Sequence, residues 1–135
     1  MAGYSQTPLS KKLGYKPGFQ VITVSEPKEY WDWIAPLPDD VKVLARAGKG
    51  NTSLVHLFVT QSRVFQKEVL KLKNAIKPDG MIWVSWPKKS SGVPSDLDEN
   101  VIRDFALKNG LVDVKVCAVS DIWSGLKLVI PVKLR

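Results

Sequence analysis

Two lysines, two serines and a glycine follow an apolar run in the second half of the chain, and these residue types can hold an anion. The apolar run is Met81–Trp86, and after Pro87 the chain continues with Lys88, Lys89, Ser90, Ser91 and Gly92. Ammonium groups, hydroxyls and the amides of a glycine-containing turn are donors that proteins present to phosphate and carboxylate groups. The segment therefore predicts a binding loop for a small anionic ligand or an acidic partner. The alternative is an ordinary exposed loop that carries two solvated lysines.

Four side chains could act as a base, a nucleophile or a metal ligand, but each lacks a partner in the sequence. His56 is the only histidine and Cys117 the only cysteine, so neither has the companions that a metal site requires. Both lie in apolar runs, which favours a hydrogen-bonded core histidine and a buried, inert thiol. Ser85 and Ser90 lie outside any Gly-x-Ser-x-Gly turn, which disfavours a hydrolase. We therefore expect no catalytic residue, no metal and no cofactor.

The chain is strongly basic. It has 20 lysines and arginines against 13 aspartates and glutamates, which gives a net charge of +7. Such a balance favours acidic proteins, small anions or nucleic acid as partners. No zinc-finger spacing or ribonucleoprotein-type motif accompanies the charge. Nucleic-acid binding would therefore depend on charge alone, and its affinity would fall steeply as salt is added.

Length and composition predict one soluble domain. The chain has 135 residues, of which 44% are apolar and 24% charged, and this is the range of a globular protein. The sequence contains no apolar run long enough to cross a membrane, and the first residues do not resemble a secretory signal. With a single cysteine, no internal disulfide is possible. We therefore expect a cytoplasmic protein without a membrane partner, and the sequence leaves its oligomeric state open.

Strands and helices have to position these residues, and the apolar periodicity predicts both. Apolar and β-branched runs predict strands at residues 19–24, 41–45, 54–59, 81–86, 111–119 and 126–132. Apolar residues at helical spacing predict helices near residues 7–13, 25–34, 62–76 and 95–109. Residues 1–18 are expected to form an N-terminal arm with one short helix, and residues 19–135 an α/β domain.

Capping residues predict where the helices begin and end. Ser25 is the expected N-cap of the second helix. Ser95 or Asp96 is the expected N-cap of the fourth helix, with Glu99 completing a capping box after Asp96. The Pro78–Gly80 segment is expected to end the third helix and to start the strand that follows it.

The order of these elements predicts a three-layer, Rossmann-like α/β fold. Right-handed crossovers place helices on both faces of a mostly parallel sheet. The last two strands have only a tight connection between them, and a parallel crossover needs about a dozen residues. They are therefore expected to form an antiparallel hairpin at one side of the sheet.

This order of elements, with the Ile76–Gly80 junction, resembles the class I methyltransferase fold. The whole chain also resembles a family of small bacterial proteins of unknown function that are described as methyltransferase-like. Six groups of residues carry that resemblance: 3–5 together with 7–9, then 56–60, 83–89, 100–104, 110–117 and 123–127. The resemblance implies the fold, and it carries no established reaction.

Two departures from active methyltransferases bear on function. Those enzymes have a glycine-rich turn after the first strand, where this chain has Ser25–Lys28. They usually have an acidic residue after the second strand to accept the ribose hydroxyls, where this chain has Arg46–Gly48. The resemblance therefore implies a non-catalytic methyltransferase-fold protein. The alternative is an S-adenosylmethionine-dependent transferase with an altered cofactor pocket.

Overall fold

Six strands form one sheet in the computed structural model, which describes residues 7–135. The sheet has the order β2-β1-β3-β4-β6-β5, with the first four strands parallel and β6 antiparallel to both of its neighbours. The strands are β1 (Gln20–Val24), β2 (Lys42–Val43), β3 (Thr52–Phe58), β4 (Ile76–Pro87), β5 (Val112–Ala118) and β6 (Trp123–Val129). The helices are α1 (Leu9–Leu13), α2 (Tyr30–Trp33), α3 (Ser62–Lys73) and α4 (Glu99–Lys108), with short 3-10 helices η1 (Lys89–Ser91) and η2 (Val132–Leu134).

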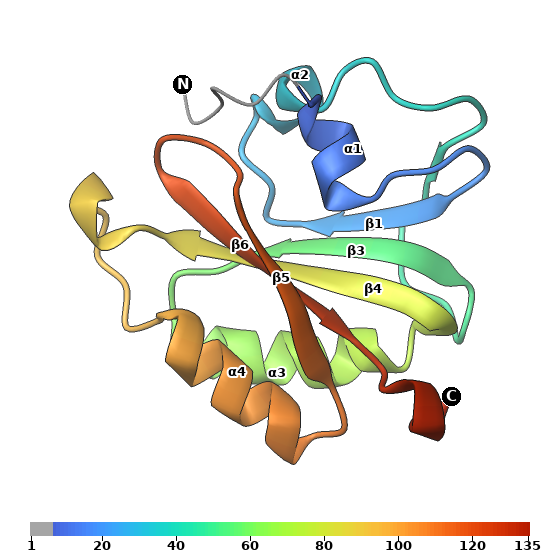
Figure 1. Cartoon of the computed structure of the whole chain (residues 1–135). Helices are drawn as coiled ribbons and strands as arrows, with labels where there is room; N and C mark the ends of the chain where they lie inside the picture. The colour runs from blue at the N-terminus through green and yellow to red at the C-terminus, as the bar shows by residue number, and fades with distance from the viewer. Residues whose placement is uncertain (1–6) are drawn as a thin grey trace.

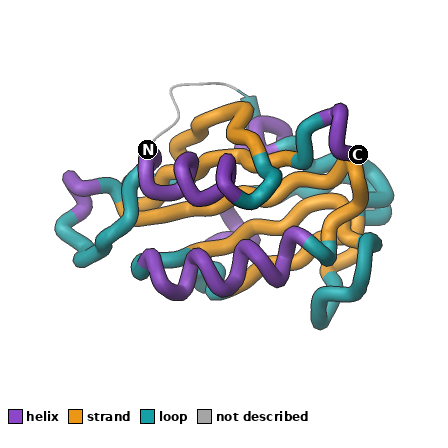
Figure 2. Tube along the Cα trace, turned by 90° about the horizontal axis from the view of Figure 1, so that it is seen from below, coloured by secondary structure: helices purple, strands orange, loops and turns teal. Residues whose placement is uncertain are grey.

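Helices cover both faces of the sheet. Figure 1 shows α1 and α2 above the strands and α3 and α4 below them. Figure 2, which is seen from below, shows helices in front of the sheet that run roughly along the strands. The predicted three-layer α/β fold, with a mostly parallel sheet and a C-terminal antiparallel hairpin, is confirmed.

Each face of the sheet has its own apolar core. On the α1 and α2 side, one cluster joins the helices to the inner strands, and it includes Leu13, Tyr30, Ile34, Leu54, Phe58 and Trp83. On the other side, a larger cluster includes Val55, Leu57, Phe65, Val69, Leu72 and Ile102. All seven residues of β3 are buried, as expected for a strand that is covered on both faces.

The junction between α3 and β4 differs from the prediction. The helix ends at Lys73 instead of residue 76, and β4 already begins at Ile76. The two carbonyls directly after the helix accept hydrogen bonds from the amides of residues 50–52. These bonds draw the chain into the sheet before the helix can continue. The Pro78–Gly80 segment therefore lies within β4, where the register against β3 shifts as in a β-bulge.

The predicted N-cap at Ser25 is wrong. Ser25 has a φ of 59° and does not precede a helix, because α2 begins only at Tyr30. The residue that precedes α2 is Glu29, whose side chain makes no capping hydrogen bond. Ser25 instead turns the chain directly after β1, in a left-handed backbone conformation that is uncommon for residues other than glycine.

The predicted capping box of the fourth helix is also wrong. α4 begins at Glu99, and its N-cap is Asp98, whose carboxylate accepts the amide of Val101 at 2.9 Å. Asp96 has a different task, because its carboxylate accepts the amide of Ser62 at 2.6 Å, at the start of α3. No local pattern in the sequence marks a contact between Asp96 and the start of a helix that is 34 residues away. The sequence therefore predicted that Asp96 caps the helix that follows it.

The C-terminal hairpin begins earlier than predicted. β6 starts at Trp123 instead of residue 126, because it pairs with β4 up to Pro87 and with β5 up to Ala118. It ends at Val129, so that Pro131 follows the strand and removes no hydrogen bond from the sheet. β6 therefore lies between β4 and β5, which makes β5 an edge strand.

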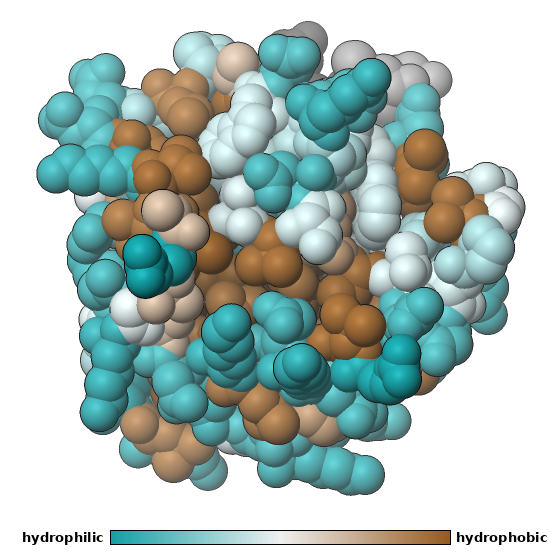
Figure 3. Space-filling model, turned by 180° about the vertical axis from the view of Figure 1, so that it is seen from behind, coloured by the Kyte–Doolittle hydropathy of each residue, from teal (hydrophilic) through white to brown (hydrophobic). Residues whose placement is uncertain are grey.

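The surface is mostly polar with some apolar area. Among the described residues, the large apolar side chains with the highest exposed fractions include Val132 at 76% and Leu134 at 58%. The rear face in Figure 3 shows apolar atoms in its middle, framed by polar side chains. Exposed apolar residues of this kind are normal for globular proteins and do not alone indicate an interface.

Candidate functional site

The carboxyl ends of β1 and β3 are the place where a sheet of this kind usually binds its ligand. The chain leaves β1 for β2 on one side and then returns to β3 on the other side. Such a change of direction opens a crevice between two neighbouring strands at their carboxyl ends. The segments that follow β1, β3 and β4 therefore form the candidate site.

The segment after β1 has a side chain at every position, and one of its residues has no amide. Ser25 adopts its left-handed conformation with a full side chain, and Glu26 and Pro27 follow. Pro27 has no backbone N–H, and its carbonyl is used by the amide of Tyr30. This turn therefore lacks the bare backbone that lets a nucleotide-like ligand approach closely.

The segment between β4 and α4 folds back over the end of β3. The hydroxyl of Ser95 donates to the carbonyl of Thr60 at 2.7 Å, and the amide of Asp96 donates to the same carbonyl at 3.3 Å. The carboxylate of Asp96 also accepts the amide of Ser62. A carboxylate therefore already occupies the amino end of α3, which is the position that would otherwise favour an anionic ligand.

The predicted binding loop leaves β4 as a tight turn that is held by its own groups. The hydroxyl of Ser91 donates to the carbonyl of Lys88 at 2.6 Å and accepts the amide of Val93 at 3.2 Å. Gly92 closes η1 with a φ of 77°, a conformation that glycine adopts without strain. The backbone conformation of this turn therefore explains why a glycine occupies position 92.

The two lysines of this loop differ in their surroundings. Lys88 donates its ammonium group to the carbonyl of Ser120 at 2.9 Å, which ties the loop to the β5–β6 turn. Lys89 and Ser90 are exposed. An anion at this loop would therefore meet one ammonium group of fixed position and one exposed ammonium group, and the binding role of Lys88, Lys89, Ser90, Ser91 and Gly92 stays a prediction.

A chain of buried polar side chains runs through the core on the α1 and α2 side. The hydroxyls of Tyr15 and Tyr30 lie 2.7 Å apart, and the Tyr30 hydroxyl lies 2.8 Å from Nδ1 of His56. Nε2 of His56 lies 2.7 Å from Oγ of Ser85. The prediction of a hydrogen-bonded core histidine is confirmed, since His56 and Ser85 are fully buried. No substrate atom can reach Ser85, so this row of hydrogen-bonded side chains has a structural role.

Burial keeps His56 neutral. It lowers the pKa of the imidazole to about 3, and it raises the pKa of Tyr15 to about 12. Burial also raises the pKa of Tyr30. In neutral histidine one ring nitrogen donates and the other accepts. Either tautomer therefore satisfies both neighbours, with the direction of the hydrogen bonds reversed between them.

Cys117 is buried, as predicted. Burial raises the pKa of its thiol, although the ammonium groups of Lys12 and Lys115 oppose this effect. A thiol with a raised pKa is a poor nucleophile at neutral pH. Within residues 7–135, no three histidine, cysteine or acidic side chains are grouped so that they could hold a metal ion. No helix in the same range is long and apolar enough to cross a membrane.

Solved structures of methyltransferases are similar to this chain. A SAM-dependent methyltransferase from Aquifex aeolicus is 15% identical, with a TM-score of 0.64 over 87% of this chain and 85% of that chain. The complex of DhpI with S-adenosylhomocysteine is 10% identical, with a TM-score of 0.63 over 92% and 83%. Magnesium protoporphyrin IX methyltransferase from Synechocystis, solved with bound SAM, is 12% identical, with a TM-score of 0.55 over 90% and 74%. A scan of protein-family models and a search of curated proteins found no match.

These similarities show that the chain has the class I methyltransferase fold. At such low identity they do not show an activity, because one fold carries many functions. Two segments at the usual cofactor cleft differ from those expected in active methyltransferases. Ser25–Pro27 replaces the glycine-rich turn, and Arg46 follows β2 where an acidic residue would accept the ribose hydroxyls.

Sequence reasoning missed both partners of His56, which are Tyr30 and Ser85. The pattern predicts Tyr30 in a helix and Ser85 in a strand, and it gives neither side chain a contact with the histidine. The available signal was the lone histidine in an apolar strand, because a buried imidazole needs a partner at each nitrogen. The sequence could not identify these partners, which lie 26 and 29 residues away along the chain.

Proposed function

We propose that this protein is a non-catalytic binding protein built on the methyltransferase fold, and that it takes a small anion or an acidic partner at Lys88–Gly92. The observation that carries the first half of this proposal is the turn after β1. There Ser25 has a left-handed backbone with a side chain attached, and Pro27 lacks an amide. A cofactor that needs close contact with a bare backbone meets side chains at this turn and one amide donor fewer.

The charge distribution supports the second half of the proposal. The net charge is +7, and the loop after β4 leaves the edge of the sheet where ligands usually bind. The bond from Lys88 to the Ser120 carbonyl holds one ammonium group in place before any ligand arrives. A fixed donor loses less conformational entropy on binding than a free lysine does.

The proposal that the protein does not bind the methyltransferase cofactor is tested by thermal unfolding. The measurement is made with S-adenosylmethionine and with S-adenosylhomocysteine, each at millimolar concentration. We expect no stabilisation, because the turn after β1 and Arg46 do not form the usual cofactor site. A ligand at 100 times its dissociation constant would add about 2.7 kcal/mol to the stability. A shift of that size would instead support the alternative function, a transferase with an altered cofactor pocket.

The proposal that Lys88–Gly92 binds an anion or an acidic partner is tested by NMR. Backbone amide signals are followed during titration with inorganic phosphate and with a hexaglutamate peptide. We expect the amides of Lys89–Gly92 to move in the native protein, and the Lys89→Glu variant to lose this response. Lys89 is preferred to Lys88 as the first variant because it is exposed and its replacement leaves the bond to Ser120 intact.

The control for this titration is Lys67→Glu, which makes the same charge change on the exposed side of α3. We expect this control to respond as the native protein does. Equal losses in both variants would reduce the effect to net charge, and an unchanged response in Lys89→Glu would remove the site from the loop. The double variant Lys88→Glu with Lys89→Glu then measures the additional effect of the fixed ammonium group.

A further inference from the structure

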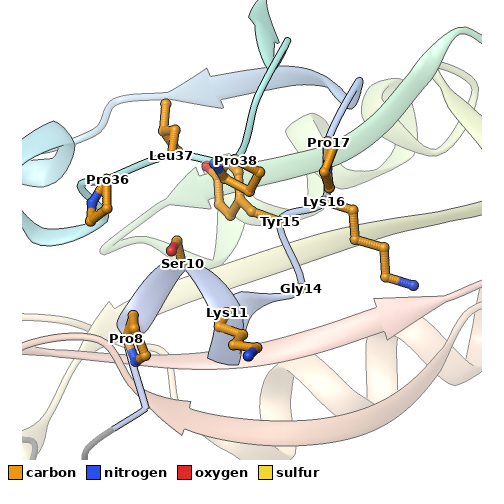
Figure 4. A pocket seen from close by; sticks show the side chains of 10 residues that line it. All are labelled: Pro8, Ser10, Lys11, Gly14, Tyr15, Lys16, Pro17, Pro36, Leu37 and Pro38. Carbon is orange, nitrogen blue, oxygen red and sulfur yellow. The ribbon is translucent and has the colours of Figure 1, made fainter.

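A pocket of about 560 Å³ lies outside the candidate site, between α1 and the connection that leads from α2 to β2. Its lining residues come from two segments, Pro8–Pro17 and Pro36–Pro38. Figure 4 shows these segments facing each other, with Tyr15 between them. Pockets that bind small molecules usually have volumes of about 300 to 1,000 Å³. The size therefore suits a small organic ligand.

The walls of this pocket are apolar and stiff. Four of the ten lining residues are prolines: Pro8, Pro17, Pro36 and Pro38. Proline has a fixed φ and no backbone N–H, so these positions supply apolar surface without amide donors. The side chain of Tyr15 is fixed in its position, because its hydroxyl is hydrogen-bonded to the hydroxyl of Tyr30. A wall that is ordered before binding costs little entropy when a ligand arrives.

The two cationic side chains of the lining lie toward one end of the pocket, whereas the hydroxyl of Ser10 lies on the side of Pro36. Lys11 and Lys16 both line it, and in Figure 4 their side chains extend away from the Pro36–Pro38 segment. Leu37 lies at the opposite end between two prolines. The pocket thus has an apolar end and a cationic end. Glu26 lies close enough to Tyr15 for its charge to raise the pKa of that residue. Glu26 does not line the pocket, so the lining contains no acidic residue.

Two further lysines, Lys115 and Lys127, lie near the segment that carries Lys16, although they do not line the pocket. Lys115 donates its ammonium group to the carbonyl of Lys12 at 3.0 Å, which places β5 beside α1. The pKa of Lys127 is lowered by burial and by the charges of Lys115 and Lys16. These like charges repel one another, and a bound anion would relieve the repulsion.

We propose that this pocket binds a small molecule that combines an aromatic ring with an anionic group. The ring lies against Tyr15 and the prolines, and the anionic group meets the ammonium groups of Lys11 and Lys16. The shape and charge of the pocket support a carboxylate and a phosphate equally, because both accept hydrogen bonds from lysine. This site is separate from the Lys88–Gly92 loop, so the two proposals stand or fall independently.

The test uses three probes that share one ring: 2-naphthoate, 2-naphthyl phosphate and the neutral 2-naphthol. Amide signals are followed in NMR spectra of the full chain. We expect at least one of the two anions to move the signals of Ser10, Gly14, Lys16 and Leu37, and to bind at least tenfold more tightly than 2-naphthol. The tighter anion identifies the head group. Signals that move elsewhere, or equal binding of the neutral probe, would overturn the proposal.

A pair of matched variants completes the test. Lys11→Glu with Lys16→Glu should weaken binding of the tighter anion at least tenfold. Lys67→Glu with Lys71→Glu makes the same change of charge on exposed positions of α3, on the other face of the sheet, and should bind as the native protein does. If the first variant does not fold, Lys11→Gln with Lys16→Gln replaces it. Equal losses in the pocket variant and its control would contradict a specific site.

Discussion

The free energy of unfolding is expected to fall by roughly 2 kcal/mol between pH 6 and pH 4.5, because His56 is buried in its neutral form. Burial lowers the pKa of His56 in the folded protein to about 3, while an unfolded histidine has a pKa of about 6.5. Between these two values, unfolding takes up a proton. Each pH unit in this range costs about 1.4 kcal/mol.

The sign of this dependence follows from which state binds the proton. Above about pH 6.5 both states are neutral at this residue, and its contribution to stability is fully present. As the pH falls toward 3, only the unfolded state is protonated, so stability is lost. The chain has a single histidine, and most carboxylates titrate below about pH 4.5. The interval above that pH therefore reports mainly on His56.

Urea unfolding followed by tryptophan fluorescence at several pH values measures this effect. In the variant His56→Gln no imidazole remains, so the slope between pH 6 and pH 4.5 should nearly vanish, even though the variant is less stable at pH 7. The variant Tyr15→Phe provides a comparison. It keeps the imidazole of His56, so its stability should depend on pH with the native slope. A native protein with a flat profile in this interval would contradict the buried, neutral histidine.

Replacement of Trp83 by alanine should lower the free energy of unfolding by about 3 to 5 kcal/mol. Trp83 is fully buried at the centre of the core on the α1 and α2 side. Its indole N–H donates to the carbonyl of Leu13 at 2.7 Å. That carbonyl lies in the last turn of α1, where backbone acceptors have no partner within the helix. The indole therefore fills the core and also fastens α1 to the sheet.

Two further variants separate these roles. Trp83→Phe keeps most of the apolar contact but removes the donor, and leaving the Leu13 carbonyl unpaired should cost about 1 to 3 kcal/mol. Trp31 is only partly buried, so Trp31→Ala should cost clearly less than Trp83→Ala. Amide hydrogen exchange should show that α1 loses protection first in the Trp83 variants. Uniform loss of protection over all elements would contradict the fastening role of the indole.

Several features of this protein were determined by local sequence. The apolar run of β3 predicted a strand that is covered on both faces, and the absence of a helix between the last two strands predicted their antiparallel pairing. Gly14 ends α1 and Gly92 ends η1, both with positive φ. Each of these features depends on residues that are close together in the chain, so their pattern is visible in the sequence.

Other features were decided by contacts between distant segments. Asp96 binds the start of α3 instead of its own helix, and the carbonyls that follow α3 accept hydrogen bonds from the amides of residues 50–52. The partners of His56 and the pocket between α1 and the Pro36–Pro38 segment also arise only when the layers assemble. Hydrogen-bond partners and cavities are set by packing across the sheet, and side chains that meet there need no regular spacing along the chain.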